Sequence, residues 1–173
     1  MPSPFTEQEY QAHLLRHQIL VVDDEERKLW EVVDIALANG FYCSLANSAP
    51  EAWEKLTASP TRYELMVCDK SMPTILESKD GYDYNGNEGL PLIPASHRYN
   101  QGLQLLRRVR SHPQLKSLDV IIYTSGGGKE QTEALGATYV YMQDVYELNE
   151  ILRQRSELYR EAVKAPEQQK KDF

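Results

Sequence analysis

The sequence has few cysteines, a deficit of positive charge and no long apolar segment. Its two cysteines, Cys43 and Cys68, both fall in segments with strand character, so we expect buried thiols rather than a disulfide framework. Lysine and arginine total 19 against 26 aspartates and glutamates, giving a net charge of −7. This balance argues against direct nucleic-acid binding, which needs a basic footprint. No apolar run is long enough for membrane insertion.

The first 18 residues also lack the basic start and apolar centre of a secretory signal, so a cytoplasmic location is the default expectation. A hydrophobic share of 41% beside 26% charged residues is typical of a globular protein. A chain of 173 residues is long enough for one domain with modest additions.

Short apolar runs alternate with segments of helical periodicity along most of the chain. Parallel neighbouring strands need such crossover helices, and right-handed crossovers place helices on both faces of the sheet. The pattern therefore predicts an α/β fold with a doubly wound, parallel, five-stranded sheet. The expected strands are 19–22, 41–46, 63–69, 120–124 and 138–142, and the expected helices are 26–38, 49–59, 102–110, 129–135 and a long helix from 145.

Polar side chains follow three of the expected strands. Asp23 and Asp24 come directly after the first, Asp69 ends the third, and Thr124 and Ser125 end the fourth. The carboxyl ends of parallel strands form the ligand-binding edge of an open α/β sheet. Acidic oxygens and a hydroxyl group at one edge are suited to holding a divalent cation and a phosphoryl group.

These motifs resemble the receiver domain of two-component response regulators. The resemblance is carried by Val-Val-Asp-Asp-Glu after the first strand, Asp-Lys-Ser-Met-Pro after the third, Tyr-Thr-Ser after the fourth and Gly-Ala before the fifth. It implies a flavodoxin-like receiver topology over residues 18–164. Residues 1–17 are expected to form an extension with a short helix, and residues 165–173 a flexible tail.

The resemblance assigns a role to each polar strand end. Asp69 would be the phosphoacceptor, and Mg²⁺ would be held by Asp23, Asp24, Asp69 and the backbone carbonyl of Ser71. Thr124 would supply the hydroxyl that turns toward the phosphoryl oxygens. Without the resemblance, the acidic pair also fits a solvated loop before a helix, and Thr124 fits an ordinary strand end.

Two positions depart from the receiver pattern. Gln143 occupies the place of the active-site lysine and Asp144 that of the following proline, so the site residue expected there can donate only a neutral hydrogen bond. Lys70, Lys79 and Lys129 are candidates to replace the missing charge.

The aromatic switch position of receivers is held by Val140, between Tyr139 and Tyr141. Strand side chains alternate, so we expect neither tyrosine to point the same way as Val140. We therefore do not expect the usual aromatic relay from the site.

Residues 74–101 form an insertion between the third strand and the next helix. A loop of this length in a compact domain is usually functional or disordered. Asp83, Asn85 and Asn87 have the spacing of calcium-loop ligands, but the glycine and final glutamate of such a loop are missing.

Two functions from different classes remain open. One is an atypical receiver in a phosphorelay, phosphorylated on Asp69 by a histidine kinase or phosphotransfer protein, signalling to a downstream protein or output module, and a possible homodimer. Its only enzymatic activity would be self-phosphorylation. The other is a phosphorylation-independent pseudo-receiver that acts as a protein-binding module. A metal-dependent phosphatase of this topology is disfavoured. Such enzymes generally have an aspartate two residues after the nucleophile, and Ser71, which stands at that place after Asp69, cannot act as a general acid or base at neutral pH.

Overall fold

The protein folds around one parallel sheet of five strands. The computed structural model describes residues 17–72 and 100–168, with side chains described as far as residue 161. The sheet order is β2-β1-β3-β4-β5, with every neighbouring pair parallel. The strands are β1 (Gln18–Val22), β2 (Tyr42–Ala46), β3 (Leu65–Cys68), β4 (Asp119–Thr124) and β5 (Thr138–Tyr141).

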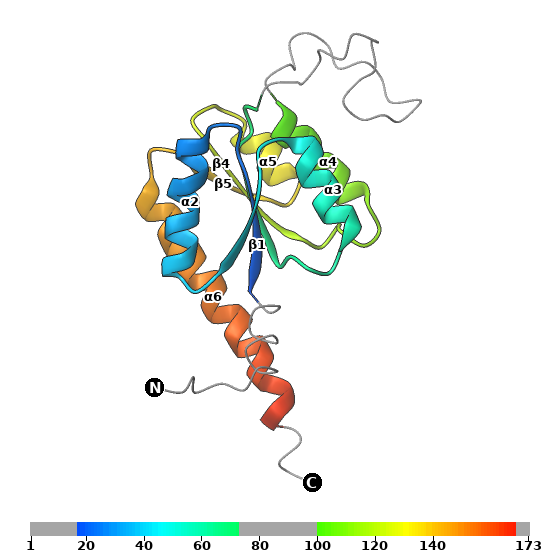
Figure 1. Ribbon diagram of the computed structural model, residues 1–173, viewed down its shortest axis with the longest axis vertical. Helices are drawn as coiled ribbons and strands as arrows, with labels where there is room; N and C mark the ends of the chain where they lie inside the picture. The colour runs from blue at the N-terminus through cyan, green and yellow to red at the C-terminus, as the bar shows by residue number, and fades with distance from the viewer. Residues whose placement is uncertain (1–16, 73–99, 169–173) are drawn as a thin grey trace.

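Helices cover both faces of the sheet and enclose two apolar cores (Figure 1). The helices are α2 (Glu26–Ala38), α3 (Ala49–Ala58), α4 (Gln101–Ser111), α5 (Lys129–Ala134) and α6 (Val145–Gln168). On one face, α2 and α6 bury residues such as Leu29 and Leu152 against the sheet. On the other, α3 and α4 bury Leu56 and Leu106. The two faces of each strand therefore belong to separate cores, as a doubly wound sheet requires.

The predicted architecture is confirmed, and the element bounds agree within a few residues. Ser48 caps the start of α3, because its hydroxyl accepts a hydrogen bond from the Glu51 N–H. Cys43 and Cys68 are free thiols, partly buried and buried respectively. No helix within residues 17–72 and 100–168 is long and apolar enough to cross a bilayer.

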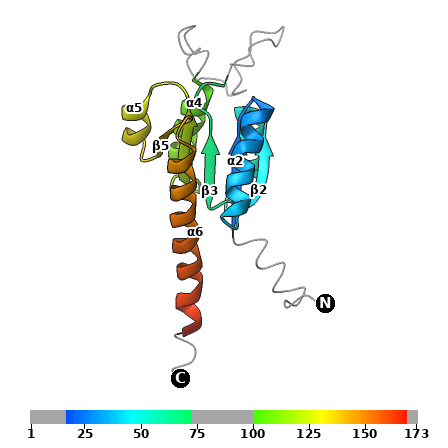
Figure 2. The ribbon, with the colours of Figure 1, turned by 90° about the vertical axis from the view of Figure 1, so that its left-hand side faces the viewer.

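Two predicted boundaries need correction. The α6 helix continues to Gln168, so the predicted tail from residue 165 begins inside the helix. Figure 2 shows α6 extending beyond the end of the sheet. The helix predicted from residue 102 begins one residue earlier, at Gln101, and the insertion predicted over residues 74–101 stays a prediction. The expected N-terminal helix, most of the insertion and the last five residues lie outside the described residues.

The start of α4 packs directly on the backbone that follows β3. The Gly102 N–H donates to the Lys70 carbonyl at 3.1 Å. A Cβ atom on Gly102 would lie 2.0 Å from the carbonyl oxygen of Asp69, which is too close for any side chain. The start of the helix near Gly102 could be predicted from the sequence, but this steric requirement for glycine could not.

Replacing Gly102 with alanine is therefore expected to destabilise the protein by about 2 kcal/mol or more, because rigid backbone must move to accept the methyl group. Urea unfolding at equilibrium measures this change. Gly127→Ala is the matched control, since a Cβ there meets nothing within 4 Å, and it should change stability by less than about 0.5 kcal/mol. Equal stability of the Gly102→Ala variant and the native protein would contradict the packing argument.

Candidate functional site

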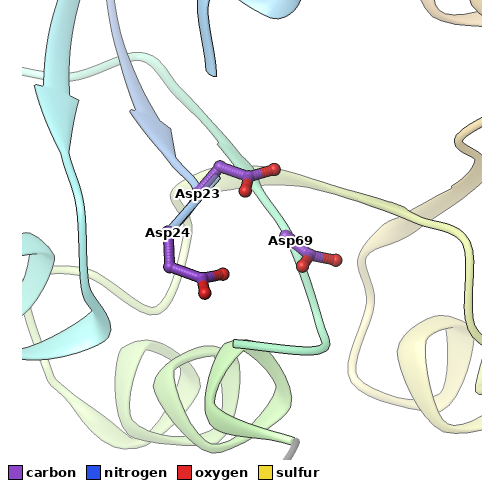
Figure 3. Close-up of side chains that lie close together, drawn as sticks. All are labelled: Asp23, Asp24 and Asp69. Carbon is purple, nitrogen blue, oxygen red and sulfur yellow. The ribbon is translucent and has the colours of Figure 1, made fainter. Parts of the chain in front are cut away.

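The carboxylates of Asp23, Asp24 and Asp69 come together at the carboxyl edge of the sheet (Figure 3). Their ligand atoms all lie within 4.8 Å of one another. The register explains this convergence: Val22 pairs with Cys68, and the Asp69 N–H donates to the Val22 carbonyl at 2.9 Å. The residues that follow β1 and β3 are thereby held side by side. We call these three residues the acidic cluster.

Burial makes the acidic cluster electrostatically unfavourable by itself. Asp23 is 3% exposed and Asp69 is 6% exposed, whereas Asp24 is open to solvent. The Oδ1 atom of Asp69 is buried and has no hydrogen-bond partner among the described residues. Buried carboxylate oxygens normally have partners. A hard divalent cation such as Mg²⁺ would satisfy them, because it prefers oxygen ligands and keeps several of its waters.

The raised pKa of Asp23 shows that its ionised form is unfavourable in the buried acidic cluster. Burial raises the pKa from 3.8 to about 7, and the nearby charge of Asp69 adds to the shift. The Glu25 N–H, which donates to Asp23 Oδ1 at 2.8 Å, and the Lys28 ammonium oppose it. Burial also raises the pKa of Asp24. A bound cation would favour the ionised carboxylates and lower these pKa values.

Thr124 and Ser71 lie next to each other at this edge. Thr124 is fully buried, and its Oγ1 lies 3.4 Å from the Ser71 Oγ. The Gly126 N–H donates to the same Thr124 oxygen at 3.3 Å. The two predicted residues are therefore together, although the role expected for Ser71 involves its backbone carbonyl and stays a prediction.

Gln143 is exposed in the turn after β5, and its side chain makes no hydrogen bond within the described part of the chain. Among the lysines proposed to replace the missing charge, Lys129 is exposed and forms only a long ion pair with Glu133 at 3.9 Å. Lys70 donates to the Gly127 carbonyl at 2.5 Å, and Lys79 lies outside the described residues. Lys28 is not among the predicted site residues, yet its ammonium interacts electrostatically with Asp23 and Asp69. Its position one turn after the acidic pair could have indicated this.

The predicted alternation in β5 is confirmed. Val140 is fully buried in the core under α2 and α6, whereas Tyr141 is 42% exposed. The Tyr139 hydroxyl donates to the Gly126 carbonyl at 2.7 Å. Tyr139 thus contacts the loop after Thr124, a link that the sequence analysis did not foresee.

The metal-free protein should lose stability as pH rises, and Asp23→Asn should reduce that loss. The folded-state pKa of Asp23, about 7, lies above the value of 3.8 for an unperturbed aspartate. The folded chain therefore binds this proton more tightly than the unfolded chain. The resulting stabilisation is complete below about pH 4 and is lost as pH rises through about 7.

Urea unfolding in EDTA at about pH 5 and about pH 8 measures the effect. At the higher pH, Asp23→Asn should be more stable than the native protein by on the order of 2 kcal/mol. Part of the pH dependence will remain, because burial also raises the pKa of Glu64 to about 7. Asp34→Asn, which changes an exposed carboxylate of α2, is the matched control. An unchanged pH dependence in Asp23→Asn would contradict the prediction.

Comparison with solved structures supports the fold. No family model matches the chain, and no curated protein matches it by sequence. Similar solved structures include the chemotaxis response regulator CheY4 of Vibrio cholerae, with 18% identity, a TM-score of 0.56, and coverage of 81% of this chain and 98% of that one. The phosphorylated cyanobacterial phytochrome response regulator RcpA has 17% identity, a TM-score of 0.56, and coverage of 83% and 94%.

A third similar structure is the CheX-CheY complex of Borrelia burgdorferi with BeF₃ and Mg²⁺. It has 17% identity, a TM-score of 0.53, and coverage of 76% of this chain and 85% of that one. At these identities the likeness establishes the fold rather than the activity. The protein described here has the fold of response-regulator receiver domains, as its strand-end motifs predict.

Proposed function

We propose that the protein is a receiver that accepts a phosphoryl group on Asp69 and thereby changes its affinity for a protein partner. The observation that carries this proposal is the acidic cluster, in which three carboxylates lie within 4.8 Å and one buried Asp69 oxygen has no partner among the described residues. The donor would be a histidine kinase, a phosphotransfer protein or a small phosphorylated compound. A cytoplasmic location, expected from the sequence, is part of this proposal.

The acidic cluster supplies both a nucleophile and a metal site. In the proposed reaction an Asp69 oxygen attacks the phosphorus atom, a bond forms between them, and the leaving group departs with the electron pair of the broken bond. Asp23, Asp24, Asp69 and the Ser71 carbonyl would hold Mg²⁺, which supplies charge neutralisation for the transferring group. Burial of Asp23 and Asp69 keeps the dielectric low, so charge interactions in the site are strong.

Thr124 is placed to respond to the phosphorylated state. Its hydroxyl lies beside Ser71 and accepts from the Gly126 N–H. A phosphoryl group on Asp69 would offer this hydroxyl a charged acceptor, which is a stronger partner than a neutral one. Movement of the hydroxyl would release the Gly126 N–H and alter the loop between β4 and α5. The structural effect of phosphorylation would thus be transmitted to the protein surface through this loop.

A pseudo-receiver that binds partners without phosphate is the second candidate. It is favoured by the exposed Gln143, which offers no positive charge, and by the valine at position 140, which cannot act as an aromatic switch. The Borrelia neighbour is bound to another protein, CheX. Under either candidate, this chain would also act through a protein partner, or through a second copy of itself.

Phosphorylation of Asp69 is directly testable. We expect the native protein with Mg²⁺ and acetyl phosphate to gain the mass of one phosphoryl group, and beryllofluoride with Mg²⁺ to shift NMR signals around Asp69. Asp69→Ala should abolish both effects. Persistence of an adduct in Asp69→Ala, or its absence in the native protein, would exclude phosphoryl transfer at this residue. Binding of Mg²⁺ without any adduct would favour the pseudo-receiver.

Gln143→Lys should strengthen the phosphorylated state. A charged donor makes a hydrogen bond roughly twice as strong as a neutral one, so affinity for beryllofluoride should rise by about tenfold. Titration followed by NMR measures the affinity. Gln154→Lys, which adds the same charge on an exposed face of α6, is the control and should leave the affinity unchanged. Equal effects of both variants would show that net charge alone is responsible.

A further inference from the structure

A cleft of about 310 Å³ lies between the end of β3, the start of α4 and the loop before α5. Its polar side chains are Lys70, Asn100, Arg107 and Gln131, and the backbone of Gly127 and Gly128 forms part of its wall. No carboxylate is among its described lining residues. The chain has a net charge of −7, so the two cationic groups and the lack of an acidic group among the described lining residues give this part of the cleft the opposite sign of charge.

Among the arginines of α4, Arg107 is the one whose guanidinium is available to bind a ligand. The helix carries three arginines and no acidic residue. Arg108 lies over the Trp53 ring at 4.0 Å, and Arg110 donates to backbone carbonyls that include Leu135 at 2.7 Å and Leu118 at 2.8 Å. The exposed Arg107 guanidinium makes no hydrogen bond or ion pair with the part of the chain that the structure describes. Its planar set of donors is therefore free for a ligand.

Lys70 is held across the same cleft. Its ammonium donates to the Gly127 carbonyl at 2.5 Å, which uses one of its three N–H groups. Gly126 and Gly128 leave room for the Lys70 side chain. A Cβ on Gly126 would lie 3.1 Å from Lys70 Nζ, and a Cβ on Gly128 would lie 3.1 Å from Lys70 Cδ. Because Lys70 directly follows Asp69, the cleft adjoins the proposed phosphoacceptor.

We propose that this cleft binds the phosphate group of a small molecule, the chemical class to which low-molecular-weight phosphodonors belong. The Arg107 guanidinium can donate two parallel hydrogen bonds to phosphate oxygens, and Lys70 supplies a second positive charge. The carboxamides of Asn100 and Gln131 add neutral donors. The volume is at the lower end of the range for small-molecule sites, which fits a phosphate with a small substituent. The use of the bound molecule as a donor to Asp69 rests on the proposed function, whereas the binding itself does not.

Binding of inorganic phosphate to the native protein in EDTA, at constant ionic strength, tests the cleft without any phosphoryl transfer. We expect saturable NMR shifts of the Gly127, Gly128 and Gln131 amides. Arg107→Gln should weaken the binding by about tenfold, as loss of a charge-assisted hydrogen bond implies, and Arg107→Lys should weaken it less. Lys116→Gln, which removes an exposed charge that does not line the cleft, should leave it unchanged.

Three results would overturn the proposal: no saturable shift of these amides, equal weakening by Arg107→Gln and Lys116→Gln, or equally tight binding of acetate. The beryllofluoride adduct is measured separately on the same samples. Phosphate binding without an adduct would count against phosphorylation of Asp69 and leave the cleft intact. An adduct without phosphate binding would count against the cleft alone.

Discussion

The candidate site depends on one constraint, which is that three carboxylates that repel one another are held together at one edge of the sheet. The parallel pairing of β1 with β3 places Asp23 and Asp69 side by side, and the surrounding cores keep both of them buried. Burial raises the pKa of Asp23, and the charge of Asp69 makes a smaller contribution in the same direction. Strongly shifted carboxyl pKa values cluster at functional sites, and binding of a divalent cation would turn the repulsion into attraction.

The positive charge near the acidic cluster comes from lysines on α2 and after β3, and position 143 contributes none. Gln143 is neutral and exposed, whereas Lys28 interacts with the cluster from α2 and Lys70 extends away from it toward the Gly127 carbonyl. The buried aliphatic Val140 belongs to the core, and the loop after Thr124 is linked to β5 through the Tyr139 hydroxyl. This protein therefore combines the fold of receiver domains with an acidic cluster whose described surroundings include Lys28 of α2 and, through Thr124, the loop that contacts Tyr139.

The order of the strands, the helices between them and the grouping of acidic residues at strand ends could all be predicted from the sequence. Short, continuous apolar runs such as those ending at Val22 and Cys68 indicate buried strands, and the carboxyl ends of parallel strands lie at one edge. The end of α6 could not be predicted as well, since a polar segment containing Pro166 gives little sign that the helix continues to Gln168. The close approach of Gly102 to the Asp69 carbonyl depends on how α4 packs after the insertion, which no local pattern specifies.

The sequence by itself determined which polar groups follow the strands: three carboxylates, one threonine hydroxyl and, after the fifth strand, the carboxamide of Gln143. Only the tertiary structure decided their environment. It buried Asp23 and Asp69, left Asp24 and Gln143 in solvent, and brought Lys70 and Arg107 to one cleft although 37 positions separate them in number. The physical reason is that burial and charge proximity arise from packing between distant elements, whereas periodicity and strand ends are local properties of the chain.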